Sequence, residues 1–333
     1  MIVCNQTQMT SRLKSFFFMA GWRFPLLRAL SSLRPVILIY HGVPAESDGT
    51  SINAELFDRH VEFLKTHFEL IPPADIARKR KATDKIRVLL TFDDGFRNNA
   101  EVVAPILRQH RVPAIFFVCS RHSTPGKYLW FSYLRALEKH FPGDGLRFRG
   151  QFLDMSPNYR ASTVRRLWES LLKLTPHPAA MYNAIEEELP RLEDFVASRE
   201  LASNYAGMTA DQVRSLAADR LFSVGAHTVD HPFLTKSEPQ EAFRQISENK
   251  NWIETLTHRR CDAIAYPTGD YDGEVLKQCR EIRFTHGYAQ TPKLAVNRNL
   301  EFPRLGIYSP ALDIVGFKVQ WGDFMRRLRL QIG

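Results

Sequence analysis

Two short polar clusters in this sequence have residue types that could hold a metal ion and a base. Asp93 and Asp94 stand side by side after the apolar run RVLLTF, and Gly95 follows them at once. His227 and His231 stand four residues apart in HTVDH, after the run LFSVGA. On a helical turn this spacing lets two imidazoles reach one cation, and neutral imidazole is a common zinc ligand.

A carboxylate from a different strand completes a site with three protein ligands and one open face. Such a site leaves a position for a water molecule, whose pKa the metal lowers toward neutrality. The chemistry then needs a ligand that holds the cation and a base that takes the proton. Two adjacent aspartates can divide these tasks, and a glycine after them permits a tight turn or a close approach of the backbone to substrate.

Each cluster also has an ordinary structural interpretation. Asp-Asp-Gly is a common turn sequence, and two histidines four residues apart often lie on a solvated helix face. The joint occurrence of both clusters after separate apolar runs favours the metal site over these alternatives.

Seven short apolar runs, rich in Val, Ile and Phe, predict buried parallel strands. Stretches with the apolar spacing of helices alternate with them, which predicts an α/β barrel or a doubly wound sheet. The strands are predicted at 36–40, 87–92, 114–119, 221–226, 262–266, 284–289 and 304–308, and the helices at 53–68, 98–110, 239–256 and 273–282.

In parallel α/β folds, the loops at the carboxyl ends of the strands build the active site. His41 follows the first predicted strand directly, so we expect its imidazole to face the same pocket. Tyr266 ends the fifth predicted strand, and Pro267 and Asp270 follow it. We expect Tyr266 and Pro267 to shape the pocket wall, since a proline after a strand chiefly stiffens the loop.

The long interval between the third and fourth strands predicts an inserted, mainly helical subdomain over 121–207. A helix follows it, with Thr209 as the expected N-cap, and returns the chain to the barrel. Trp130, Phe131 and Tyr133 could stack on sugar rings, but their spacing is more typical of a helix core. Helices are predicted at 128–141, 163–174 and 208–220, and a hairpin at 145–153.

Composition places limits on the class of protein. The chain has 333 residues, 44% of them hydrophobic, which is enough for a substantial core. A formal net charge of +9 favours an anionic neighbour, but no motif for reading nucleic acid is present, so we expect no nucleic-acid partner. The four cysteines are widely spaced, which argues against a disulfide framework and against a thiolate zinc site.

The two ends of the chain are basic. Residues 1–34 contain Arg and Lys without an acidic residue, and the tail 311–333 mixes aromatic residues with arginines. This composition is typical of helices that lie in a membrane interface, although docking of the two segments on the barrel is favoured. The apolar stretch at 16–22 is short for a signal sequence, so we expect a cytoplasmic protein. Peripheral contact with an anionic membrane surface is the alternative role for the two basic segments.

The motif TFDDG, followed far downstream by GAHTVDHPFL and AYPTGDYD, resembles the polysaccharide deacetylase superfamily (NodB homology, carbohydrate esterase family 4). The resemblance covers roughly residues 35–310, interrupted by the insertion. The opening ILIYHGV also resembles members that act in bacterial exopolysaccharide and surface-glycan assembly. The resemblance implies an irregular (β/α)7 barrel, and the seven predicted strands agree with it.

The resemblance also implies a role for each residue of the two clusters. Asp93 is the implied base, while Asp94, His227 and His231 are the implied ligands of a divalent metal, which we expect to be zinc. Thr228 is implied to hold the histidine loop. The implied reaction is hydrolysis of an N-acetyl, sometimes O-acetyl, group on a sugar.

The sequence departs from the family in two places. Many members carry an arginine before the proline and glycine of IAYPTG, to orient the base, and here that position is Ala265. Arg304 is our candidate substitute, and it also joins Tyr266 and Pro267 as a candidate substrate-binding residue. The family's late Leu-x-His motif, whose histidine is the general acid, is not recognisable; His41 is the leading substitute and His286 a weaker one, for which a structural role is favoured.

The sequence therefore predicts a metal-dependent deacetylase that acts on an N-acetylated sugar in a bacterial polysaccharide, surface glycan or glycan precursor. The rival is a catalytically impaired barrel that only binds glycan, since two family features are missing. Release of acetate separates the two.

Overall fold

The computed structural model describes residues 35–46, 52–78, 85–291 and 299–327. The predicted basic arm, residues 1–34, and the last residues of the predicted tail, 328–333, lie outside this part of the chain.

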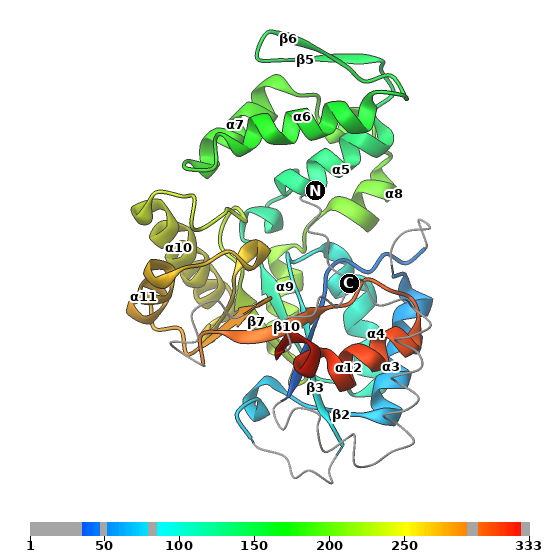
Figure 1. Cartoon of the computed structure of the whole chain (residues 1–333), viewed down its shortest axis with the longest axis vertical. Helices are drawn as coiled ribbons and strands as arrows, with labels where there is room; N and C mark the ends of the chain where they lie inside the picture. Colours follow the sequence, from blue (N-terminus) through cyan, green and yellow to red (C-terminus); the bar gives the residue numbers. More distant parts are fainter. Residues whose placement is uncertain (1–34, 47–51, 79–84, 292–298, 328–333) are drawn as a thin grey trace.

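Seven parallel strands close into a barrel (Figure 1). Their order is β1-β10-β9-β8-β7-β4-β3, and β1 pairs again with β3 to complete the ring. A short strand, β2 (Glu69–Leu70), adds to β3. All seven predicted strands are confirmed, and the barrel replaces the doubly wound alternative: β1 (Val36–Tyr40), β3 (Arg87–Phe92), β4 (Ala114–Val118), β7 (Phe222–Ala226), β8 (Ala263–Ala265), β9 (His286–Ala289) and β10 (Phe302–Gly306).

The strands form where apolar and β-branched residues run without interruption, because both faces of a parallel strand are covered. Every residue of β1, β3 and β4 is buried. Phe92 at the end of β3 stacks on Tyr40 and on Phe116, with ring centroids 5.6 and 5.0 Å apart. This aromatic stack packs the barrel just below the strand ends that carry the polar clusters.

Helices on the outside of the barrel agree with the predicted ones. Thr209 caps α9 in a capping box, in which its hydroxyl accepts from the Gln212 amide and the Gln212 side chain accepts from the Thr209 amide. The predicted helix at 98–110 differs, because it begins with a π-helical segment, η2 (Asn99–Val103). The outer helices are α3 (Ala54–His67), α4 (Ala104–His110), α9 (Ala210–Ala218), α10 (Pro239–Thr257), α11 (Gly273–Glu281) and α12 (Leu312–Arg327).

The insertion lies at one end of the barrel, at the top of Figure 1, with the helices α5, α6 and α7 below a hairpin. It has a hydrophobic cluster of its own, distinct from those of the barrel, with residues such as Leu137, Leu167 and Tyr182. Its main elements are α5 (Trp130–His140), β5 (Gly145–Phe148), β6 (Gln151–Asp154), α6 (Arg160–Leu172), α7 (Pro178–Glu188), α8 (Ser198–Glu200) and a π-helical segment, η5 (Leu201–Tyr205). The limits 121–207 stay a prediction.

The first half of the predicted tail is part of the folded barrel. Val315 and Val319 of α12 are fully buried in the main hydrophobic cluster, and α12 packs beside α3. This packing agrees with the docking interpretation for that half. Across the described ranges, no helix combines the length and apolar character needed to cross a membrane.

Candidate metal centre and its surroundings

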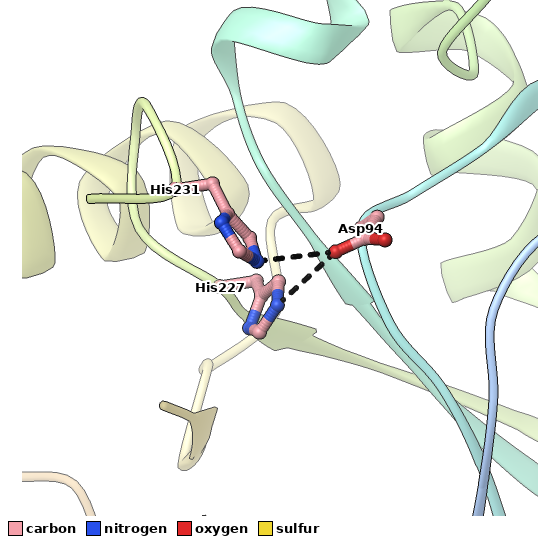
Figure 2. Close-up of side chains that lie close together, drawn as sticks. All are labelled: Asp94, His227 and His231. Atoms are coloured by element: carbon pink, nitrogen blue, oxygen red, sulfur yellow. Dashed lines mark ion pairs between the residues drawn. The ribbon is translucent and has the colours of Figure 1, made fainter. Parts of the chain in front are cut away.

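Asp94 and the two histidines converge at the carboxyl ends of β3 and β7 (Figure 2). Oδ1 of Asp94 lies 3.4 Å from Nε2 of His227 and 3.4 Å from Nε2 of His231. All three ligand atoms lie within 4.8 Å of one another, and the three side chains are buried. Two imidazoles and one carboxylate are the donor set of a three-ligand zinc site with an open position, so the residues fit the predicted cation.

The loop that carries the histidines is not helical, so the predicted helical turn is wrong. Thr228 and His231 both have left-handed backbone, with φ of 68° and 52°. The hydroxyl of Thr228 accepts from the backbone N–H of His231 at 3.1 Å and closes this turn. The turn brings the two imidazole centroids to 5.0 Å, which a spacing of four residues alone does not require.

A backbone carbonyl fixes the orientation of the His227 ring. Nδ1 of His227 donates to the carbonyl of Ala265 at the end of β8, at 2.8 Å. The proton therefore sits on Nδ1, and the lone pair of Nε2 faces Asp94, as metal-ligating histidines require. Ala265, where many family members carry an arginine, thus serves the site through its backbone.

The two histidines differ in their affinity for protons. Burial lowers the pKa of His231 to about 4, so this imidazole is neutral near pH 7. Burial would also lower the pKa of His227, but the carboxylates of Asp93 and Asp94 outweigh it and raise that pKa. Cation binding therefore competes with protons at His227 and not at His231.

Asp94 and Gly95 both have left-handed backbone, with φ of 74° and 78°. A Cβ at Gly95 would lie 2.8 Å from Cγ1 of Val118 in β4. The glycine is therefore needed for the turn and for packing against the neighbouring strand. The structure agrees with the predicted tight turn at Gly95. The segment that the backbone of Gly95 approaches closely is strand β4.

Asp93 forms a bidentate ion pair with Arg304 of β10, at 2.7 and 2.8 Å. Both side chains are buried, and the guanidinium also donates to the hydroxyl of Thr91. Burial alone would raise the pKa of Asp93, but the charge of Arg304 outweighs it and holds that pKa below its ordinary value. Arg304 thus occupies the position expected of a substitute for the missing arginine. Its side chain is only 1% exposed, which argues against the predicted direct contact with substrate.

The four residues of the two clusters share one cavity of about 310 Å³ with His41. The imidazole of His41 stacks on the ring of Tyr308, with centroids 6.0 Å apart. The side chain of Asn99 donates to the His41 carbonyl at 3.0 Å, and Asn98 accepts from the amide of Val43. Asn98 and Asn99, which follow the two aspartates closely in the chain, therefore hold the loop that carries His41.

The other sequence candidates lie around or outside this cavity. Tyr266 lines it, but its hydroxyl donates to the carbonyl of Leu300, so it forms a wall. Pro267 is buried and is not among the lining residues; its neighbour Thr268 is. Asp270 instead accepts from Thr235 in the loop after the histidines.

His286 lies away from the site. It opens β9, whereas the site is at the carboxyl ends of the parallel strands, and its ring stacks on Phe302. The structural role favoured for His286 agrees with this position.

The polysaccharide deacetylase family model matches residues 80–138 and 182–287, on both sides of the middle of the insertion. The chain belongs to the polysaccharide deacetylase family. The Bacillus subtilis (strain 168) protein "Putative polysaccharide deacetylase YxkH" is 20% identical over 266 residues, which are 78% of this chain. The chain spans about 65% of the length of that curated relative.

Solved structures of deacetylases share the fold. IcaB from Ammonifex degensii is 16% identical with a TM-score of 0.56, over 87% of this chain and 98% of that one. The Streptococcus pyogenes deacetylase PplD is 19% identical with a TM-score of 0.52, over 83% and 95%. A de-N-acetylase from Aggregatibacter actinomycetemcomitans is 17% identical with a TM-score of 0.53, over 85% and 99%. At these identities the likeness establishes the barrel.

In this polysaccharide deacetylase family member, the insertion also contacts the metal-ligand loop. Nε1 of Trp130 donates to the carbonyl of His231 at 3.2 Å, and the hydroxyl of Tyr182 donates to the carbonyl of Asp230 at 2.8 Å. The ring of Phe131 meets His231 edge-on, with centroids 4.9 Å apart. Trp130 lies in the helix core, as the spacing favours, yet it also lines the cavity with Phe131. These contacts could not be predicted from the sequence, because no spacing rule links Trp130, Phe131 or Tyr182 to the histidines.

Proposed function

We propose that this protein removes the acetyl group from an N-acetylated sugar of a glycan or glycan precursor, with a divalent cation, zinc by its donor set, as cofactor. One observation carries the proposal: an ionised, arginine-paired aspartate lines the same cavity as an Asp-His-His donor set. Membership of the polysaccharide deacetylase family supports it.

The residues divide the chemistry. A divalent cation held by Asp94, His227 and His231 would supply Lewis-acid activation of a water molecule and of the acetyl carbonyl. Asp93 accepts the proton of the attacking water on its carboxylate, which Arg304 orients and keeps ionised. Tyr266 and Phe131 form part of the wall of this cavity.

His41 is our candidate for the general acid. It stands in the same cavity, on the side away from the histidine loop, with its backbone held by Asn99. From there a ring nitrogen of His41 delivers a proton to the leaving amine, so that the products are acetate and the free amino sugar. His41 thereby takes the role of the histidine motif that the sequence lacks.

The test compares two neighbouring aspartates. Asp93→Asn removes the base and spares the ligands, so we expect metal to stay bound while kcat for acetate release falls by roughly two to four orders of magnitude. Asp94→Ala removes one of three ligands, so we expect loss of metal as well as activity. Metal content and acetate are measured on the same preparations. Full activity in Asp93→Asn, or full metal occupancy in Asp94→Ala, would contradict the assignment.

The glycan-binding barrel remains the second candidate because Leu-x-His is missing. Its signature is a metal-loaded wild-type protein that binds N-acetylated oligosaccharide and releases no acetate. The Asp93–Arg304 ion pair weighs against it, since it supplies the guanidinium that the motif lacks.

Cytoplasmic localisation, with the basic arm in contact with an anionic membrane, is also a proposal. Each exposed basic residue contributes about 1 kcal/mol of attraction to such a surface. A variant without residues 1–34 should lose salt-sensitive flotation with vesicles that contain anionic lipid, while the tail is kept because Val315 and Val319 belong to the barrel core. Equal flotation of both proteins would contradict the proposal.

A further inference from the structure

The site cavity continues into two further cavities that share its lining residues. On the side of β1, a cavity of about 400 Å³ shares His41, Asp94 and Phe131 with it. On the side of the insertion, a cavity of about 320 Å³ shares Trp130 and Phe131. Phe131 of α5 lines all three cavities, and Arg135 lines both the β1-side cavity and the insertion cavity, so the three adjoin one another around Phe131.

The cavity on the insertion combines aromatic and charged side chains. Trp168 of α6 lines it and stands 4.5 Å from the ring of Trp130, centroid to centroid. Arg165 and Glu138 line it as well, and both are exposed. Aromatic faces that pack on apolar sugar faces, with a few polar groups for the hydroxyls, are the usual composition of a small polar-ligand site.

The cavity on the side of β1 also combines aromatic and polar side chains. Tyr308, 62% exposed, lines it beside His41, and Asn98 and Asn204 contribute amide groups. At about 400 and 320 Å³, both flanking cavities are at least as large as the central one of about 310 Å³. Each therefore has room for the same kind of unit that the central cavity must hold, a single sugar.

We propose that the α5–α6 face of the insertion is a carbohydrate-binding subsite, which holds the sugar next to the one that is deacetylated. With the cavity on the β1 side, the three adjoining cavities together have room for a substrate of at least three sugars. The inference rests on the proposed function of the central site, and it defines the substrate class as an oligosaccharide or polysaccharide.

The choice of variants follows from the contacts. Trp130 and Phe131 touch the His231 loop, so substitutions there would disturb the metal centre as well as the subsite. Arg165 is exposed and lines the cavity, whereas its neighbour Arg166 is exposed, donates to Thr163 and does not line it. Arg165→Gln therefore tests the subsite, and Arg166→Gln is its matched control. Trp168→Leu is a second test, since it removes the aromatic face.

The experiment uses zinc-loaded full-length protein and N-acetylglucosamine oligomers of one to six sugars. We expect kcat/KM for acetate release to rise by about tenfold or more up to three sugars, which corresponds to about 1.4 kcal/mol or more of added binding. Arg165→Gln and Trp168→Leu should lower the ratio of hexamer to monomer kcat/KM by about threefold or more, and Arg166→Gln should not change it.

Failure of the subsite and failure of the proposed function give different results. A kcat/KM independent of chain length, or equal ratios in Arg165→Gln and Arg166→Gln, would overturn the subsite. If no oligomer releases acetate, binding to zinc-loaded Asp93→Asn is measured by calorimetry. Affinity that grows with chain length and falls in Arg165→Gln would then support the subsite and overturn the deacetylase assignment, and affinity without either dependence would overturn the subsite as well.

Discussion

Barrel and insertion contribute to the same cavity in different ways. From the barrel come the side chains of Asp93, Asp94, His227 and His231, all placed at the ends of strands. From the insertion come hydrogen bonds to the backbone of the histidine loop and one aromatic wall, Phe131. The inserted segment is therefore part of the machinery that positions one metal ligand.

The two regions also hold the site with interactions of different strength. The barrel uses a buried ion pair, whose disruption leaves an uncompensated charge. The insertion uses neutral hydrogen bonds to carbonyls, each of which contributes about 1 kcal/mol. Substitutions in the barrel should therefore act on folding and on the base, and those in the insertion on metal affinity.

Arg304→Met should have the largest effect, because it leaves the buried Asp93 carboxylate without its partner. We expect the free energy of unfolding to fall by about 3–5 kcal/mol in urea titrations of the metal-free protein. The double variant Asp93→Asn/Arg304→Met removes both charges and should recover most of this loss. A single variant as stable as the wild type would show that the ion pair does not hold the barrel.

Tyr182→Phe should weaken metal binding by about 10–100-fold, the usual consequence of losing a partner in the outer shell of a metal site. Its hydroxyl donates to Asp230, next to His231. Tyr133→Phe is the matched control. Tyr133 belongs to the same insertion core, but its hydroxyl donates to the carbonyl of Pro190, away from the metal loop. Competition with a zinc chelator gives both affinities. Equal zinc affinities in the two variants would show that the insertion does not position the metal-ligand loop.

Asn99→Ala changes the barrel instead of the insertion, and it should lower turnover without changing zinc affinity. It removes the donor to the His41 carbonyl and leaves the metal ligands in place. We expect kcat to fall about tenfold, near the low end of what misplacing a proton donor costs, while zinc affinity stays unchanged. A parallel loss of zinc affinity would mean that the His41 loop and the metal loop are one unit.

The smallest expected effect concerns pH. Burial lowers the pKa of His60, which is enclosed between Tyr40 and the carbonyl of Pro310. The unfolded chain takes up the proton at higher pH than the folded chain does, so the free energy of unfolding falls as pH drops below about 6.5. His60→Gln should flatten this dependence between pH 7.5 and 5.5. His140→Gln, in the more exposed insertion, should flatten it less, and the reverse order would contradict the difference in burial.

Parts of the site that depend on one strand end could be predicted from the sequence. The apolar runs place Asp93, Asp94 and His227 at the carboxyl ends of strands, where the structure has them. The turn at Thr228 and His231 could not, because left-handed backbone in these residue types leaves no mark in the letters. Contacts from Trp130 and Tyr182 join segments far apart in sequence, so no local pattern predicts them. Arg304 was the candidate substitute for the missing arginine, but its pairing with Asp93 needed the structure.

Strand β10, which closes the barrel, also determines when the barrel can form during synthesis of the chain. Arg304 in β10 is paired in register with Ile37 in β1, so the barrel cannot close until translation has passed β10, which ends at Gly306. At roughly 5–20 residues per second, β1 waits for tens of seconds with one edge unpaired. During that time the edge of β1 that pairs with β10 is open to strands of other nascent chains, and the carboxylate of Asp93 lacks its counter-charge. A chain interrupted before β10 would carry all three metal-ligand residues, but its barrel would stay open and its strand edges would be prone to aggregation.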